Sequence, residues 1–202
     1  MNKSAKSIIT EIKQFVKKHN LDSLADVALF LLITLAIHYL WHYWAKHLHY
    51  VPLNEFMSDA QKWMANGVFR QGIWFVQNVL GIELRIVQES NAMYFNNDTY
   101  MFINRSCSGL KQIMQFVVLM MVFPGPWKRK LWFIPLGAVI VHFINLFRVI
   151  GLSVVLVTKP IYWSFSHDYI FKPLFYLVIF LLWVWWVDKV SKKKKAKIEK
   201  AT

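Results

Sequence analysis

The sequence has 202 residues, of which 56% are hydrophobic and 17% aromatic, and its formal net charge is +13. Apolar and aromatic content this high is atypical of a soluble domain and indicates a membrane protein, and the single cysteine excludes an intramolecular disulfide. Most of the 24 Lys and Arg residues lie in segments 1–21, 125–130 and 188–202, which flank long apolar stretches. This distribution is typical of loops held on the cytoplasmic side of a membrane, so we expect no nucleic-acid partner.

The N-terminal part of the chain contains a predicted surface helix and a first membrane span. In segment 1–21, Ile8, Ile12 and Phe15 share one helical face, which predicts an amphipathic interfacial helix on the cytoplasmic surface. Residues 24–44 are long and apolar enough to cross a hydrocarbon core of about 30 Å. No small-residue cleavage site follows this run, so we expect an uncleaved anchor.

The next two segments are expected to lie outside the membrane. Residues 53–81 mix Trp and Phe with amide and charged side chains, which favours an amphipathic helix on the extracytoplasmic surface. In segment 82–105, Ile82, Leu84 and Ile86 alternate with Glu83 and Arg85, and turn-forming residues follow. This pattern predicts a small β-hairpin.

Three further spans are predicted, at 109–124, 131–157 and 170–187, with an outer loop at 158–169 between the last two. Four crossings place the N-terminus and the basic tail at 188–202 on the cytoplasmic side, as the positive charges require. The predicted fold class is therefore an α-helical integral membrane protein with about four transmembrane helices, an extracytoplasmic amphipathic helix and a small β-hairpin. Residues 22–187 form a single membrane-embedded domain in this interpretation.

The predicted topology brings Cys107, Arg148 and His167 to one depth, near the outer membrane face. Cys107 opens the second span, and His167 lies in the last outer loop. Arg148 lies roughly 25 Å from the inner end of the third span, at a rise of about 1.5 Å per residue. A helix start favours an anion, and a guanidinium and an imidazole nearby would stabilise a thiolate. Together these features indicate nucleophilic chemistry at Cys107.

Each of these residues also has an ordinary structural explanation. A lone cysteine is often an inert apolar filler, and an arginine near a membrane face can extend to the headgroups. His167 acquires significance only from its pairing with Cys107 and from Asp168, which either orients the imidazole or is merely solvated. No carboxylate cluster accompanies the other histidines near the first span, so no metal or cofactor is expected there. These are His38, His42, His47 and His49.

Three motifs occur in an order that resembles the exosortase/archaeosortase family over roughly residues 75–187. They are Cys107-Ser108-Gly109-Leu110, the Asn145-x-x-Arg148 pair, and His167 before the last span. Lys111 stands where that family often has arginine, and the family usually has more spans before this core, so the chain resembles a short member.

The resemblance implies a cysteine peptidase or transpeptidase in which Cys107 is the nucleophile. Arg148 would stabilise the thiolate or the oxyanion, and His167 would act as general acid and base. The expected supporting residues, of which Ser108 and Gly109 also allow backbone N–H groups to approach an oxyanion, are Ser108, Gly109, Asn145 and Asp168.

The resemblance also implies a substrate and a location. Such enzymes act on exported proteins that carry a C-terminal short motif, an apolar span and a basic cluster, and they form a thioester at the outer face of the cytoplasmic (inner) membrane. The lipid bilayer and a surface glycan or lipid acceptor are the other expected partners. The alternative is a non-enzymatic membrane scaffold or assembly partner whose outer hairpin binds another protein. A small transporter is disfavoured because the spans carry few polar residues at mid-depth.

Overall fold

The computed structural model describes residues 22–47, 53–123 and 125–199, so the helix predicted at 1–21 lies outside the described residues. Two compact units are distinguished, Met1–Leu48 and His49–Thr202. In the first unit, α2 (Asp22–His47) is a continuous helix. Its apolar stretch Asp26–Trp44 is long enough to cross a membrane, which agrees with the span predicted at 24–44.

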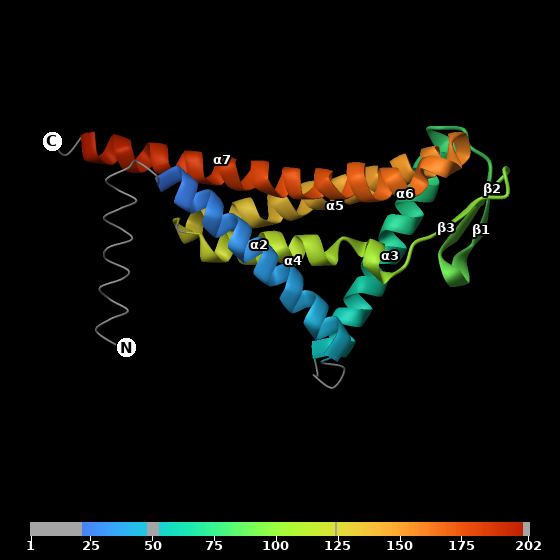
Figure 1. Ribbon diagram of the computed structural model, residues 1–202, viewed down its shortest axis with the longest axis horizontal. Coiled ribbons are helices and arrows are strands. Elements are labelled where there is room, and N and C mark those ends of the chain that lie inside the picture. The colour runs from blue at the N-terminus through green and yellow to red at the C-terminus, as the bar shows by residue number, and fades with distance from the viewer. Residues whose placement is uncertain (1–21, 48–52, 124, 200–202) are drawn as a thin grey trace. The chain divides into compact units, whose positions relative to one another are not determined.

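The second unit begins with α3 (Leu53–Asn78) and a small antiparallel sheet in the order β1-β2-β3. The strands are β1 (Leu84–Val87), β2 (Ala92–Phe95) and β3 (Tyr100–Phe102), with the 3₁₀ turn η1 (Gln88–Ser90) between the first two. The rest of the unit is η2 (Arg105–Ser108), α4 (Leu110–Val122), α5 (Trp127–Thr158), η3 (Pro160–Tyr162), α6 (Trp163–Phe165), η4 (Ser166–Phe171) and α7 (Lys172–Glu199). In Figure 1, α4, α5 and α7 run alongside one another, and α3 crosses α5 at the end where the sheet lies.

Three helical stretches within the described residues are long and apolar enough to span a membrane: Asp26–Trp44, Trp127–Thr158 and Pro160–Lys189. The predicted class, an α-helical membrane protein with a small sheet, is therefore confirmed. α4 is apolar but has only 13 residues, which at about 1.5 Å per residue covers roughly 20 Å. The segment expected to cross at 109–124 is thus shorter than the other spans, because part of it forms η2 and the turn before α5.

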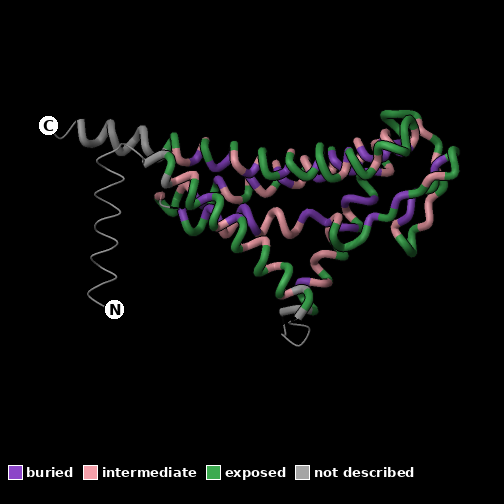
Figure 2. The backbone as a smooth tube through the Cα atoms, in the orientation of Figure 1, coloured by how far each residue is buried: buried purple, intermediate pink, exposed green. Residues whose placement is uncertain are grey.

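Apolar side chains lie on the outside of the helices as well as inside. Leu131, Val139 and Phe143 of α5 and Leu177 and Leu181 of α7 are all more than half exposed. Figure 2 shows such exposed positions alternating with buried ones along α5 and α7. In water this surface would be costly, so it is the lipid-facing surface of these helices.

The turn from α4 into α5 is closed by a buried lysine. Lys130 is 4% exposed, and its Nζ donates to the carbonyl oxygens of Met121 at 3.0 Å and Phe123 at 2.7 Å. These carbonyls are among those that the end of α4 leaves without an intrahelical partner. Nearby, a Cβ on Gly137 would lie 2.1 Å from Phe116 Cζ, so this glycine allows α4 and α5 to pack closely.

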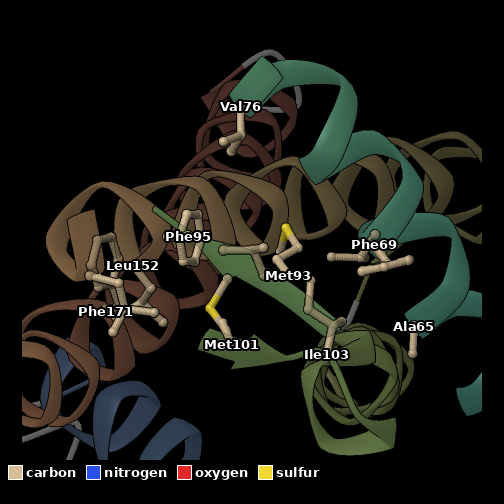
Figure 3. Packing of buried hydrophobic residues seen from close by; sticks show 12 residues of the cluster. Ala65, Phe69, Val76, Met93, Phe95, Met101, Ile103, Leu152 and Phe171 are labelled. Carbon is tan, nitrogen blue, oxygen red and sulfur yellow. The ribbon is translucent and has the colours of Figure 1, made fainter. Parts of the chain in front are cut away.

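The sheet covers a hydrophobic cluster with one face. Met93, Phe95, Met101 and Ile103 alternate along β2 and β3 and past the end of β3, and all four are buried, as the two-residue period of a strand requires. In Figure 3 they meet side chains from α3, such as Phe69, and others from the C-terminal half of the chain: Leu152 and Phe171. This cluster anchors the end of β3, from which the chain enters η2.

The predicted outer loop at 158–169 is wrong in its structure. The segment forms η3, α6 and the π-helical turn η4, and the helical path continues into α7. Pro160 occupies the first positions of η3, where its missing N–H costs no hydrogen bond. The aromatic residues that follow pair at helical spacing, Phe165 with Tyr169 at 5.3 Å between ring centroids.

Candidate active site

Cys107 lies in the 3₁₀ turn η2, which the chain enters from β3. The Asn104 side chain caps this turn by accepting from the Ser106 N–H at 3.0 Å, and the Cys107 N–H donates to the Asn104 carbonyl at 2.9 Å. The thiol-bearing residue is half-buried and packs against the hydrophobic cluster. Cys107 was expected at the start of a helix. Instead, it precedes α4, whose first N–H, that of Leu110, donates to the Ser108 hydroxyl at 3.2 Å.

Gly109 separates the cysteine turn from α4 and touches Asn145 of α5. Its φ of 78° is in the left-handed region, and a Cβ added there would lie 2.9 Å from the Asn145 Nδ2 atom. Asn145 is fully buried, and its Nδ2 donates to the Cys107 carbonyl oxygen at 2.7 Å. Residues 38 apart in the sequence are thus joined directly. The glycine and the asparagine together fix the backbone that carries the thiol.

Arg148 lies one helical turn after Asn145 and is 8% exposed. Its Nη2 lies 2.7 Å from His167 Nε2, and His167 Nδ1 lies 2.7 Å from Asp168 Oδ1. Lys172 Nζ donates to the same carboxylate oxygen at 2.7 Å. A continuous line of hydrogen bonds therefore runs from the buried guanidinium to the end of the π-helical turn.

The chemistry of the partners determines the proton positions on His167. A guanidinium can only donate, and an ionised carboxylate can only accept. Nε2 therefore accepts from Arg148, and Nδ1 carries the proton and donates to Asp168. This arrangement describes a neutral imidazole whose Nε2 lone pair becomes available as a base when the guanidinium moves.

The imidazole is also held by an aromatic ring. Trp163 stacks on His167, with ring centroids 5.1 Å apart and an interplanar angle of 14°. The Arg148 Cζ lies 6.0 Å from the ring centroid of Phe175. π-Helical turns widen a helix locally and are frequent at functional sites, and η4 is the turn that carries His167.

Arg148 is the residue that connects the two halves of the site. It is hydrogen-bonded to His167 and interacts electrostatically with both Cys107 and Asp168. Its Nε and the Asn145 Oδ1 atom are buried and make no hydrogen bond to any described residue. Two polar atoms next to the cysteine turn thus remain available for a bound group.

Every residue expected in the site lies in this region, by two kinds of contact. Arg148, His167 and Asp168 are hydrogen-bonded to one another, and Asn145 holds the cysteine turn. Ser108 is buried and accepts from the start of α4. Among the described residues, no three His, Cys, Asp or Glu side chains gather as a metal site would need.

Three supporting residues were missed from the sequence: Asn104, Trp163 and Lys172. Trp163 precedes His167 by four residues, and Lys172 follows Asp168 by four. This spacing brings side chains together on a helix but not in a loop. Recognising 158–169 as helical would have identified both. Asn104 carries a weaker signal, since Asn two residues before Ser106 is a common turn-capping pattern.

Comparison with known proteins gives one match. A family model described as "Transmembrane exosortase (Exosortase_EpsH)" matches residues 19–185. No curated protein and no solved structure matches the chain. The matched range exceeds the 75–187 region that carries the motifs and includes most of α2 and all of α3.

Proposed function

The chain belongs to the transmembrane exosortase family, and we propose that it is a membrane cysteine peptidase or transpeptidase that acts on C-terminal sorting signals of exported proteins. The observation that carries the proposal is the hydrogen-bonded line from Arg148 through His167 to Asp168, beside a cysteine turn that Asn145 holds in place. A base, a cation and a thiol within one buried region are the groups that acyl transfer through a thioester requires.

The first half of the proposed reaction forms the thioester. Cys107 Sγ attacks the substrate carbonyl carbon while its proton passes to His167 Nε2. For this step the Arg148 guanidinium leaves Nε2 and turns to the carbonyl oxygen, where negative charge develops. Asp168, which accepts from Nδ1, stabilises the imidazolium. The imidazolium then gives the Nε2 proton to the leaving amine, the C–N bond breaks, and the shortened substrate remains bound to sulfur.

The second half releases the product. An acceptor with an O–H or N–H group loses its proton to His167 Nε2 as it attacks the thioester carbon. The C–S bond then breaks, and the thiolate takes the proton back from the imidazolium. Water as acceptor gives hydrolysis, whereas a hydroxyl or amine of a surface glycan or lipid gives transfer.

The proposed orientation follows from the charges. Lys and Arg in segments 1–21, 125–130 and 188–202 favour the cytoplasmic side of the inner membrane. Cys107, Arg148 and His167 then lie toward the extracytoplasmic face, where an exported substrate presents the segment before its transmembrane span. Because Cys107 is the only cysteine, a membrane-impermeant maleimide applied from the outside of intact cells should label the wild-type protein and not Cys107→Ala.

Thioester trapping in membranes tests the proposed chemistry. Exported proteins that keep a C-terminal apolar tail in Cys107→Ala cells, but lose it in wild-type cells, identify the substrate. Neutral hydroxylamine should release that substrate from the wild-type enzyme as a hydroxamate. Continued trimming by Cys107→Ala, or trimming with no hydroxamate from the wild type, would contradict the nucleophile assignment and favour a scaffold.

A further inference from the structure

α3 and α5 are separated by an apolar groove that the proposed chemistry does not use. The two helices approach closely where a Cβ on Gly72 would lie 3.4 Å from Val149, and they diverge on either side of that point. The resulting hollow has a volume of about 970 Å³. Trp74 of α3 and Phe143 and Phe147 of α5 border it, and each is more than half exposed. Exposed aromatic rings around a hollow are the mark of a surface that another apolar molecule covers.

A second hollow adjoins the first along α3. It has a volume of about 510 Å³ and a polar lining that includes Asn66, Gln88 and Glu89. Arg70 lines both hollows. Its side chain is exposed, and no described residue forms an ion pair or hydrogen bond with it. Since helical residues rise about 1.5 Å each, the lining from Asn66 to Phe75 extends for about 14 Å, from polar to apolar.

This polarity profile selects one kind of occupant. A membrane-spanning helix fits the apolar groove, and the polar segment that leads into such a helix fits the second hollow. The amide groups of Asn66 and Gln88 both donate and accept, as recognition of a peptide backbone requires. A phospholipid fits less well, because the Glu89 carboxylate lies in the same hollow as Arg70 and would repel a phosphate.

The groove is continuous with the proposed catalytic site through a single turn of α5. Phe147 and Gly151 line the groove, and Arg148 lies between them in the sequence. The Phe147 ring also contacts Phe171 edge-on, with centroids 6.2 Å apart, and Phe171 ends the π-helical turn that carries His167. A helix seated in the groove therefore lies against the same turn of α5 that bears the guanidinium.

We propose that the α3–α5 groove is the docking site for the transmembrane helix of the exported substrate, with Arg70 at the junction between that helix and its polar leader. The inference rests on the proposed function, because it takes its substrate class from it. It goes beyond that function in assigning substrate capture to Arg70, Trp74 and the groove face of α5 rather than to the residues around Cys107.

Photo-crosslinking tests the groove without requiring catalysis. Trp74 is replaced by p-benzoylphenylalanine in the full chain carrying Cys107→Ala, reconstituted in vesicles with a synthetic peptide. The peptide has a polar leader, an apolar helix long enough to span the bilayer and a lysine cluster. The matched control places the same photo-reactive residue at Trp132, an exposed tryptophan of α5 that does not line the groove. We expect a peptide adduct at position 74 and none at position 132.

The competing occupants give different adducts. An adduct at position 74 only with lipid, only with a second copy of the chain, or only within the same chain would overturn the inference. Equal peptide adducts at positions 74 and 132 would also overturn it, since they would show non-specific contact in the bilayer. None of these results depends on whether Cys107 is a nucleophile, so failure here is distinguishable from failure of the proposed function.

Kinetics with the native substrate provide the second test. Val154→Trp fills the groove two turns beyond Arg148, and Arg70→Gln removes the charge that both hollows share. Each should raise KM about tenfold with kcat within twofold of the wild type, because a charged hydrogen bond or its apolar equivalent contributes about that factor to binding. The matched controls Val139→Trp and Arg85→Gln, both exposed and outside the two linings, should leave KM within twofold. Wild-type KM in both groove variants would contradict the docking site.

Discussion

Asn145 provides the sharpest test of how the site is built. Its Nδ2 donates to the Cys107 carbonyl across 2.7 Å, and the side chain is fully buried. Asn145→Ala leaves that carbonyl without its donor, which costs about 1–3 kcal/mol for a buried polar group. If the loss falls on the active position of the cysteine turn, about 2 kcal/mol corresponds to roughly a 30-fold fall in the fraction of enzyme ready to react.

The assay is the initial rate of substrate processing in membranes, normalised to folded protein. We expect Asn145→Ala to lower kcat about 10- to 100-fold with KM changed by less than threefold, since the residue positions the nucleophile and does not touch the docking groove. Asn145→Asp keeps the shape but removes the donor, so it should show a loss at least as large.

The matched control is Asn97→Ala. Asn97 Nδ2 also donates to a carbonyl of α5, that of Leu156 at 2.8 Å, but it lies away from the cysteine turn. We expect its kcat within about threefold of the wild type. Wild-type kcat in Asn145→Ala, or an equal loss in both asparagine variants, would refute the positioning argument.

Three further substitutions follow from the same geometry. Gly109→Ala places a methyl group 2.9 Å from the Asn145 amide at a left-handed φ, so processing should fall at least tenfold; maleimide labelling of the sole thiol should change with it, and unchanged labelling and activity would count against the close contact. Asp168→Asn removes the charge that faces the protonated imidazole, so kcat should fall about tenfold at constant KM, whereas a KM effect alone would place the residue in binding. Gly137→Ala forces a methyl group against the Phe116 ring, so thermal unfolding in detergent should show a destabilisation of about 1–3 kcal/mol, and an unchanged midpoint would contradict the tight α4–α5 packing.

The sequence by itself determined the features that depend on local pattern. Long apolar runs predicted the membrane class, and the spans at 24–44, 131–157 and 170–187 coincide with helices of the structure. Two-residue alternation predicted the strand at 84–87, because a strand buries every second side chain. The motifs around Cys107 and Arg148 resembled the family whose model matches residues 19–185.

Local pattern failed where tertiary contacts override it. Segment 158–169 has no continuous apolar period, so it was interpreted as a loop. It is helical because its aromatic side chains pair at four-residue spacing, as Trp163 does with His167. The helix expected at 109–124 is shortened for a related reason: Gly109 adopts a left-handed conformation that separates the cysteine turn from α4.

Only the tertiary structure decided how the candidate site residues meet. Nothing in a sequence states that Asn145 reaches the Cys107 carbonyl from a distant helix, or that Arg148 donates to His167 Nε2 while Asp168 accepts from Nδ1. These contacts depend on which faces of α4, α5 and η4 oppose one another. That is determined by the packing of the hydrophobic cluster and not by the period of any single segment. The residue types of the site could therefore be predicted from the chain, but their proton positions and their order of contact could not.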